Sequence, residues 1–119
     1  KTRHPLDRME HAQVTRLDQL DTLAKMDIPI CIQPIFSSEL SWARERLGPK
    51  RIETAYAWQE MISRGIRLLA GSDAPVDEAD PHIAAETASE PTGAHHLDYQ
   101  QCLQLFSRNN WEFYGISPV

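Results

Sequence analysis

Three polar residues, His11, Gln33 and Asp73, each stand at the end of a stretch that predicts a β-strand. Imidazole and carboxylate groups are a ligand pair for zinc and related divalent ions, and a carboxylate can also take a proton from water. Each residue also has a purely structural explanation: His11 as a hydrogen-bonded residue, Asp73 as a turn former or helix cap, and Gln33 as a partner for loop backbone. Their common placement favours a shared site, because functional residues of parallel α/β folds collect where the strands end.

The elements that must position these residues alternate along the sequence. The apolar patterns predict strands over residues 6–12, 28–35 and 66–72. Helices are predicted to start from a cap at Thr15, over 37–47, over 51–64, from a cap at Asp98, and as a short turn over 111–114. Residues 71–93, rich in Pro, Gly and Asp, are predicted to be irregular. Strands joined by helical crossovers indicate an α/β fold with a parallel sheet, which puts His11 and Asp73 two strands apart on one edge.

Length and composition narrow the function classes. The chain has 119 residues, is 41% hydrophobic and carries a net charge of −5, which is typical of one folded domain or part of one. The acidic balance argues against nucleic acid as a partner, and no apolar run is long enough to span a membrane. Two cysteines, Cys31 and Cys102, do not form a disulfide framework, which favours a reducing, cytoplasmic location. The opening at Lys1 without a Met suggests a segment of a longer protein.

Four motifs resemble the amidohydrolase superfamily, in the branch of predicted metal-dependent hydrolases that includes N-substituted formamide deformylases. The first is Arg8-Met9-Glu10-His11-Ala12-Gln13, and the last is Gly71-Ser72-Asp73-Ala74-Pro75-Val76. Between them lie Gln33-Pro34 followed by Trp42, Arg46-Leu47-Gly48 and Arg51, and then the stretch 56–65. The four motifs occur in the family's order and at its spacing, over most of residues 8–115.

The resemblance implies a partial (β/α)8 TIM barrel, in which residues 1–119 are a C-terminal fragment with strands six to eight. It implies that His11 binds a divalent metal, most simply zinc. It also implies that Asp73 binds this metal and takes the proton from the attacking water. Gln33 would contact the substrate, a small molecule with a non-peptide amide or related C–N bond.

The sequence departs from the family pattern in ways that bear on activity. The family's remaining metal ligands, on strands one to five, have no counterpart here, and Phe36 stands where the family has a His. We therefore expect the isolated chain to bind no metal tightly and to be inactive. His95 and His96 are expected to be exposed to solvent.

Three strands of a barrel would also leave one face of the sheet uncovered. That face includes Ile30 or Cys31 and Leu68 or Leu69, so we expect the chain to form a homo-oligomer through it or to rearrange. Two other functions stay open on the sequence. One is a small non-enzymatic α/β module that binds a partner through its sheet. The other is an unrelated hydrolase in which Asp73 acts as a nucleophile.

Overall fold

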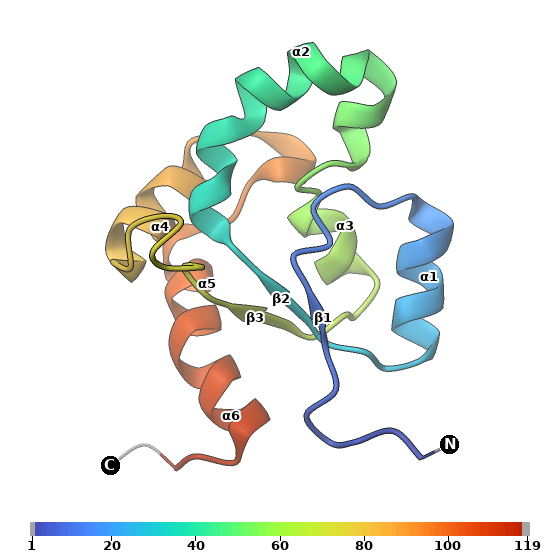
Figure 1. The fold of residues 1–119 in the computed structure, drawn as a ribbon, viewed down its shortest axis with the longest axis vertical. Coiled ribbons are helices and arrows are strands. Elements are labelled where there is room, and N and C mark those ends of the chain that lie inside the picture. The colour runs from blue at the N-terminus through green and yellow to red at the C-terminus, as the bar shows by residue number, and fades with distance from the viewer. Residues whose placement is uncertain (1, 118–119) are drawn as a thin grey trace.

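Three parallel strands form the centre of the fold, in the order β1-β2-β3 (Figure 1). The computed structural model describes residues 2–117. The strands are β1 (Met9–Glu10), β2 (Ile30–Ile32) and β3 (Leu68–Ala70). Met9 pairs with Ile30, and Ile30 in turn pairs with Leu68. The predicted parallel α/β sheet is therefore confirmed, although each strand is shorter than the apolar pattern suggested.

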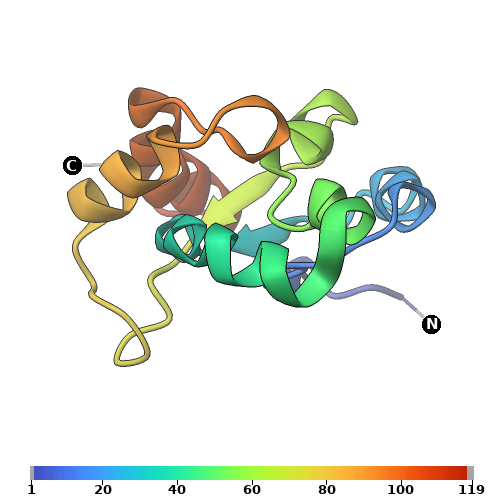
Figure 2. The same cartoon turned by 90° about the horizontal axis from the view of Figure 1, so that it is seen from above.

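The helices surround this sheet, and the loop from β3 to α4 projects away from the body (Figure 2). They are α1 (Leu17–Lys25), α2 (Leu40–Arg51), α3 (Trp58–Ser63), α4 (Pro81–Ser89), α5 (Tyr99–Gln104) and α6 (Asn110–Tyr114). Short 3-10 turns precede α2, follow it and precede α5, and a π-helical turn joins α5 to α6. Within residues 2–117, no helix is long and apolar enough to cross a membrane.

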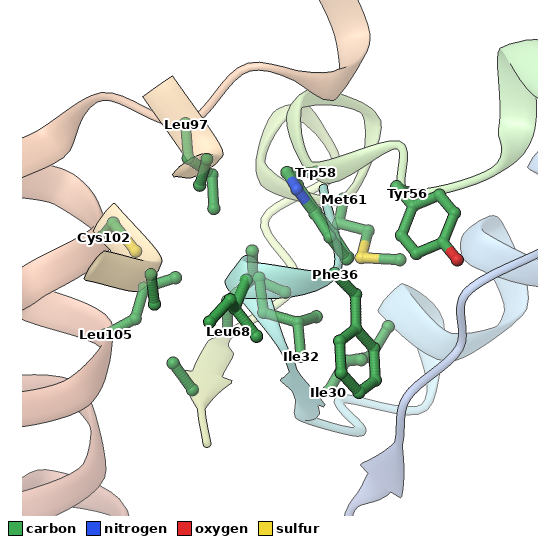
Figure 3. Close-up of a cluster of buried hydrophobic side chains, with 14 of the residues drawn as sticks. Ile30, Ile32, Phe36, Tyr56, Trp58, Met61, Leu68, Leu97, Cys102 and Leu105 are labelled. Atoms are coloured by element: carbon green, nitrogen blue, oxygen red, sulfur yellow. The ribbon is translucent and has the colours of Figure 1, made fainter. Parts of the chain in front are cut away.

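The main core lies between the sheet and the helices that cover it (Figure 3). Ile30, Ile32 and Leu68 contribute alternate strand positions to it and are buried. Trp58 and Met61 of α3 pack into the same cluster, together with residues of α1 and α5. The apolar run 28–35 is thus explained by burial, as expected of a strand in a parallel sheet.

The helix predicted over residues 51–64 is confirmed only over Trp58–Ser63 (α3), and its first half is wrong because the chain leaves α-helical geometry there. A 3-10 turn at Ile52–Thr54 is followed by Ala55, which forms an antiparallel bridge with Val14. The Tyr56 N–H then donates to the Gln13 carbonyl at 2.7 Å, and Tyr56 has a φ of 48°. A long-range backbone pairing therefore overrides an apolar spacing that is compatible with a helix.

The irregular segment predicted over residues 71–93 is also wrong in part, since α4 lies within it. Asp80 caps this helix by accepting a hydrogen bond from the His82 N–H at 2.8 Å, and Pro81 occupies the first turn. The helix buries Ala84, Ala85 and Ala88. Asp followed by Pro is a helix-start signal that the sequence carried.

The first and second predicted helices differ from the structure in their ends. Helix α1 is capped at Arg16 rather than Thr15, and the Gln19 side chain accepts a hydrogen bond from the Arg16 N–H at 2.9 Å. Helix α2 starts after a 3-10 turn at Pro34–Glu39 and is interrupted at Gly48, whose φ is 77°. This positive φ explains why a glycine stands at that position.

The predicted cap at Asp98 is confirmed. Its carboxylate accepts hydrogen bonds from the Gln100 and Gln101 N–H groups at 3.0 and 3.2 Å. The resulting helix, α5, places the buried Cys102 against the core.

Replacing Asp98 with alanine is expected to lower the free energy of unfolding by about 1 kcal/mol, because the two N–H groups lose their acceptor. Urea denaturation of the two proteins measures the difference. Glu86→Ala, which removes an exposed side chain of α4, serves as the control and should change stability by less than about 0.5 kcal/mol. Equal losses in the two variants would contradict the capping role of Asp98.

Candidate functional site

His11, Gln33 and Asp73 follow the carboxyl ends of β1, β2 and β3, respectively. Because the three strands are parallel, these ends lie along one edge of the sheet. His11 and Gln33 come directly after their strands, whereas Asp73 follows three residues after Ala70. The predicted placement of all three residues after strand ends is confirmed.

His11 and Gln33 are in direct contact across the neighbouring strand ends. The distance between His11 Nδ1 and Gln33 Oε1 is 2.7 Å, a short hydrogen bond. The His11 backbone N–H also donates to the Cys31 carbonyl at 2.9 Å, which continues the β1–β2 pairing by one residue. The Gln33 side chain is buried, with 4% of its surface exposed, whereas His11 is exposed. A buried amide thus holds an imidazole whose Nε2 has no hydrogen-bond partner among residues 2–117.

Both candidate metal-binding residues have left-handed backbone conformations. The φ angles are 67° at His11 and 60° at Asp73, and Ala12 follows with 49°. A positive φ is uncommon for residues other than glycine, and such conformations concentrate at functional sites. The left-handed conformation at His11 accounts for the end of β1 at Glu10, before the end of the strand predicted over residues 6–12.

Asp73 presents a free carboxylate at the start of the β3–α4 loop. Its backbone carbonyl accepts a hydrogen bond from the Val76 N–H at 2.8 Å, which closes a turn. Ser72 Oγ accepts from the Ala74 N–H at 3.2 Å, so the neighbouring side chain, and not Asp73, stabilises the loop backbone. The Asp73 side chain is exposed and has no hydrogen bond or ion pair with the rest of the described chain. Its carboxylate is therefore available to a cation or to a proton.

An imidazole nitrogen and a carboxylate are suitable ligands for a divalent cation, but two groups are fewer than a metal centre normally has. The described part of the chain contains no cluster of three or more His, Cys, Asp or Glu side chains that could hold a metal ion. His11 and Asp73 therefore fit a metal in ligand type and supply part of a ligand set.

Gln33 has a different environment from the one expected of a substrate contact. Its carbonyl oxygen is used by His11, and its amide nitrogen lies 3.5 Å from the Cys31 carbonyl. The residue types of His11 and Gln33 did not by themselves indicate this hydrogen bond. The signal that the sequence offered was that the two residues follow successive predicted strands. Phe36 is buried in the core rather than facing solvent at this edge.

The other histidines and the cysteines have structural surroundings. His95 and His96 are half-buried, which corrects the expectation that they are exposed; His96 Nδ1 lies 2.9 Å from the Pro91 carbonyl. Both cysteines are free thiols. Burial raises the pKa of Cys31 to about 11 and that of Cys102 to about 12, so both thiols stay protonated at neutral pH.

A groove lies beside β1, at the side of the sheet opposite β3. Its lining includes Met9, Ala12, Val14, Thr15 and Leu23, from β1, the following loop and α1. β1 has a strand neighbour only on its β2 side among the described strands. The groove thus runs along the free edge of the sheet.

Comparison with known proteins adds independent information. Residues 1–118 match the Amidohydrolase family. The chain is 39% identical over 106 residues to the putative amidohydrolase YtcJ of Bacillus subtilis, covering 84% of this chain and 20% of that protein. It thus spans about a fifth of the curated relative's length.

Two crystal structures share its fold, both of uncharacterized metal-dependent hydrolases. One, from Pyrococcus furiosus, has a TM-score of 0.80 and 26% identity, covering 89% of this chain and 23% of that chain. The other, from Pyrococcus horikoshii, has a TM-score of 0.78 and 25% identity, covering 89% of this chain and 24% of that chain. The match over residues 1–118 is decisive, and we conclude that the chain belongs to the amidohydrolase family.

Proposed function

We propose that this chain is the C-terminal part of a (β/α)8 barrel, with strands six to eight, in a longer metal-dependent amidohydrolase. The observation that carries the proposal is the common sheet edge of His11, Gln33 and Asp73, with a free imidazole nitrogen and a free carboxylate. The family match and the metal-dependent hydrolases of the same fold support it. The short share of the relatives that the chain covers supports its being one part of such a barrel.

The chemistry follows from the two free groups. His11 would offer Nε2 to a divalent cation, with zinc as the first choice for an imidazole and carboxylate site. Asp73 would bind the same cation, accept the proton of the attacking water, and deliver it to the leaving nitrogen. The bound cation would supply polarisation of the water and of the substrate carbonyl group. The reaction would be hydrolysis of a C–N bond in a small, non-peptide amide.

The proposed function has consequences for the isolated chain and for the class of substrate, that of the N-substituted formamide deformylase branch. We infer that residues 1–119 alone bind metal weakly and are inactive, because His11 and Asp73 are only part of a ligand set. N-substituted formamides are the first substrates to test. The free thiols of Cys31 and Cys102 support a reducing, cytoplasmic setting. The test is to express the longer protein, determine its metal content and assay a panel of N-formyl compounds, other amides and esters. Hydrolysis of esters alone, or a protein active without divalent metal, would contradict the proposal.

The free edge of β1 would be covered by the preceding strand of the longer protein. In the isolated chain, we propose that a second copy covers this edge. Met9 is 41% exposed there, and the neighbouring groove is lined by further apolar side chains. The sheet face expected to be uncovered is largely buried instead: Ile30, Leu68 and Leu69 are inaccessible, and Cys31 is half-buried. The lateral edge of β1, rather than the face of the sheet, is therefore the surface that favours association.

Sedimentation of the isolated chain at high micromolar concentration is expected to show dimers or larger species, because an unpaired strand edge and apolar groove are exposed together. Val14→Lys places a charge in the groove and should shift the population toward the monomer. Ile83→Lys, on the exposed side of α4, is the matched control and should leave the distribution unchanged. A compact monomer at these concentrations would contradict the assignment of the edge.

A further inference from the structure

Gln33 is unusual among the polar residues of the described chain, because its side chain is buried. Ser37 is the other buried polar residue, and its hydroxyl donates locally to the Pro34 carbonyl. Gln33 instead reaches His11 on the neighbouring strand end. A buried amide that forms its short hydrogen bond with an exposed imidazole is well placed to hold that imidazole in one orientation.

The orientation of the Gln33 amide determines which nitrogen of His11 carries hydrogen. Gln33 Nε2 lies 3.5 Å from the Cys31 carbonyl, which can only accept, so the amide nitrogen belongs on that side. The amide oxygen then faces His11 Nδ1 at 2.7 Å. A carbonyl oxygen cannot donate, so Nδ1 must carry the hydrogen in this contact. In the neutral ring, Nε2 is then the atom with a free lone pair.

We propose that Gln33 is a positioning residue for His11, which fixes the Nδ1–H tautomer and so presents Nε2 to a metal ion. The metal part of this inference rests on the proposed function, whereas the tautomer part rests on the observed contact between His11 and Gln33. A histidine that binds a metal through one nitrogen commonly donates its other N–H to a neighbouring acceptor, which fixes tautomer and ring orientation. Gln33 supplies such an acceptor from the adjacent strand, and its burial limits the positions that the amide can take.

The test uses the 119-residue chain labelled with ¹⁵N at histidine, at a pH of about 8.5, where ordinary imidazoles are neutral. Long-range ¹H–¹⁵N correlation spectra distinguish the two tautomers, and His11→Ala assigns the His11 signals. We expect His11 in the wild type to be mainly the Nδ1–H tautomer. Gln33→Leu, which has a similar size and no acceptor, should shift the tautomer ratio about fivefold toward Nε2–H. Gln33→Glu keeps an acceptor and should retain Nδ1–H, and Gln101→Leu on α5 is the control.

The wild-type spectrum alone can overturn the proposal, since a mainly Nε2–H ring would contradict it whether or not a variant folds. An unchanged tautomer ratio in Gln33→Leu would also overturn it. Zinc titration of the same samples gives a second measurement: the His11 ring signals of Gln33→Leu should need about ten times more zinc for the same response. If the tautomer result holds and the longer protein binds its metal without His11 as a ligand, the proposed metal role fails while the positioning by Gln33 stands.

Discussion

Replacing His11 or Asp73 with alanine in the longer protein is expected to lower kcat/KM for the amide substrate by at least about a thousandfold. His11→Ala removes the imidazole whose Nε2 is free of partners, and Asp73→Ala removes the exposed carboxylate at the end of β3. Under the proposed function, each variant would lose a proposed metal ligand, and the Asp73 variant would also lose the proposed acceptor of the proton from water. Steady-state kinetics and the metal content of each purified variant measure the two effects together.

The neighbouring loop provides the control for this prediction. Asp77→Ala removes another carboxylate of the β3–α4 loop, one that accepts a hydrogen bond from the Glu78 N–H at 2.8 Å. We expect its kcat/KM to stay within about twofold of the wild type, as for an ordinary surface substitution. If His11→Ala or Asp73→Ala kept near-normal activity with normal metal content, these residues would not form the proposed site. An equal loss in Asp77→Ala would point instead to general damage of the loop.

The largest expected effect on stability is that of Trp58→Ala, at about 3–5 kcal/mol. Trp58 lies at the centre of the core with 1% of its surface exposed, and its ring packs edge-to-face on Tyr56 at 5.8 Å between centroids (Figure 3). A domain of this size is usually stable by about 5–15 kcal/mol, so the variant should be largely or partly unfolded under mild conditions. Urea denaturation followed by circular dichroism measures the loss.

Two further variants separate the contribution of packing from that of the indole N–H. Trp58 Nε1 is buried and has no hydrogen-bond partner among the described residues. Trp58→Phe should therefore cost less than half as much as Trp58→Ala, because it keeps an aromatic ring and removes an unpaired polar group. Trp42→Ala, at a position 54% exposed where Arg46 stacks on the ring at 4.9 Å, should cost about 1 kcal/mol or less. A loss in Trp42→Ala as large as that in Trp58→Ala would contradict this account of the core.

Local patterns predicted the parts of the fold that local forces determine. The run around Ile30 and the segment ending at Ala70 are strands because both are buried, and Asp98 caps α5 because its carboxylate meets the backbone of the next turn. The break at Tyr56 could not be predicted in the same way. It depends on the pairing of Ala55 with Val14, which is far away in the sequence.

The candidate site also combines features that local sequence patterns predict with features that depend on contacts between distant residues. The sheet edge on which His11, Gln33 and Asp73 lie follows from strand direction, and the sequence therefore predicted it. The hydrogen bond between His11 and Gln33 depends on the relative register of two strand ends and on the left-handed backbone at His11. Neither the register of the strand ends nor the backbone conformation of His11 can be predicted from the residue types.

Anomalous diffraction from crystals of the longer protein, recorded at the absorption edge of its metal, tests most directly whether His11 and Asp73 share a cation. The account predicts an anomalous peak at about 2.0–2.2 Å from His11 Nε2 and at a similar distance from an Asp73 carboxylate oxygen. A metal coordinated elsewhere in the protein, with neither side chain as a ligand, would contradict the account.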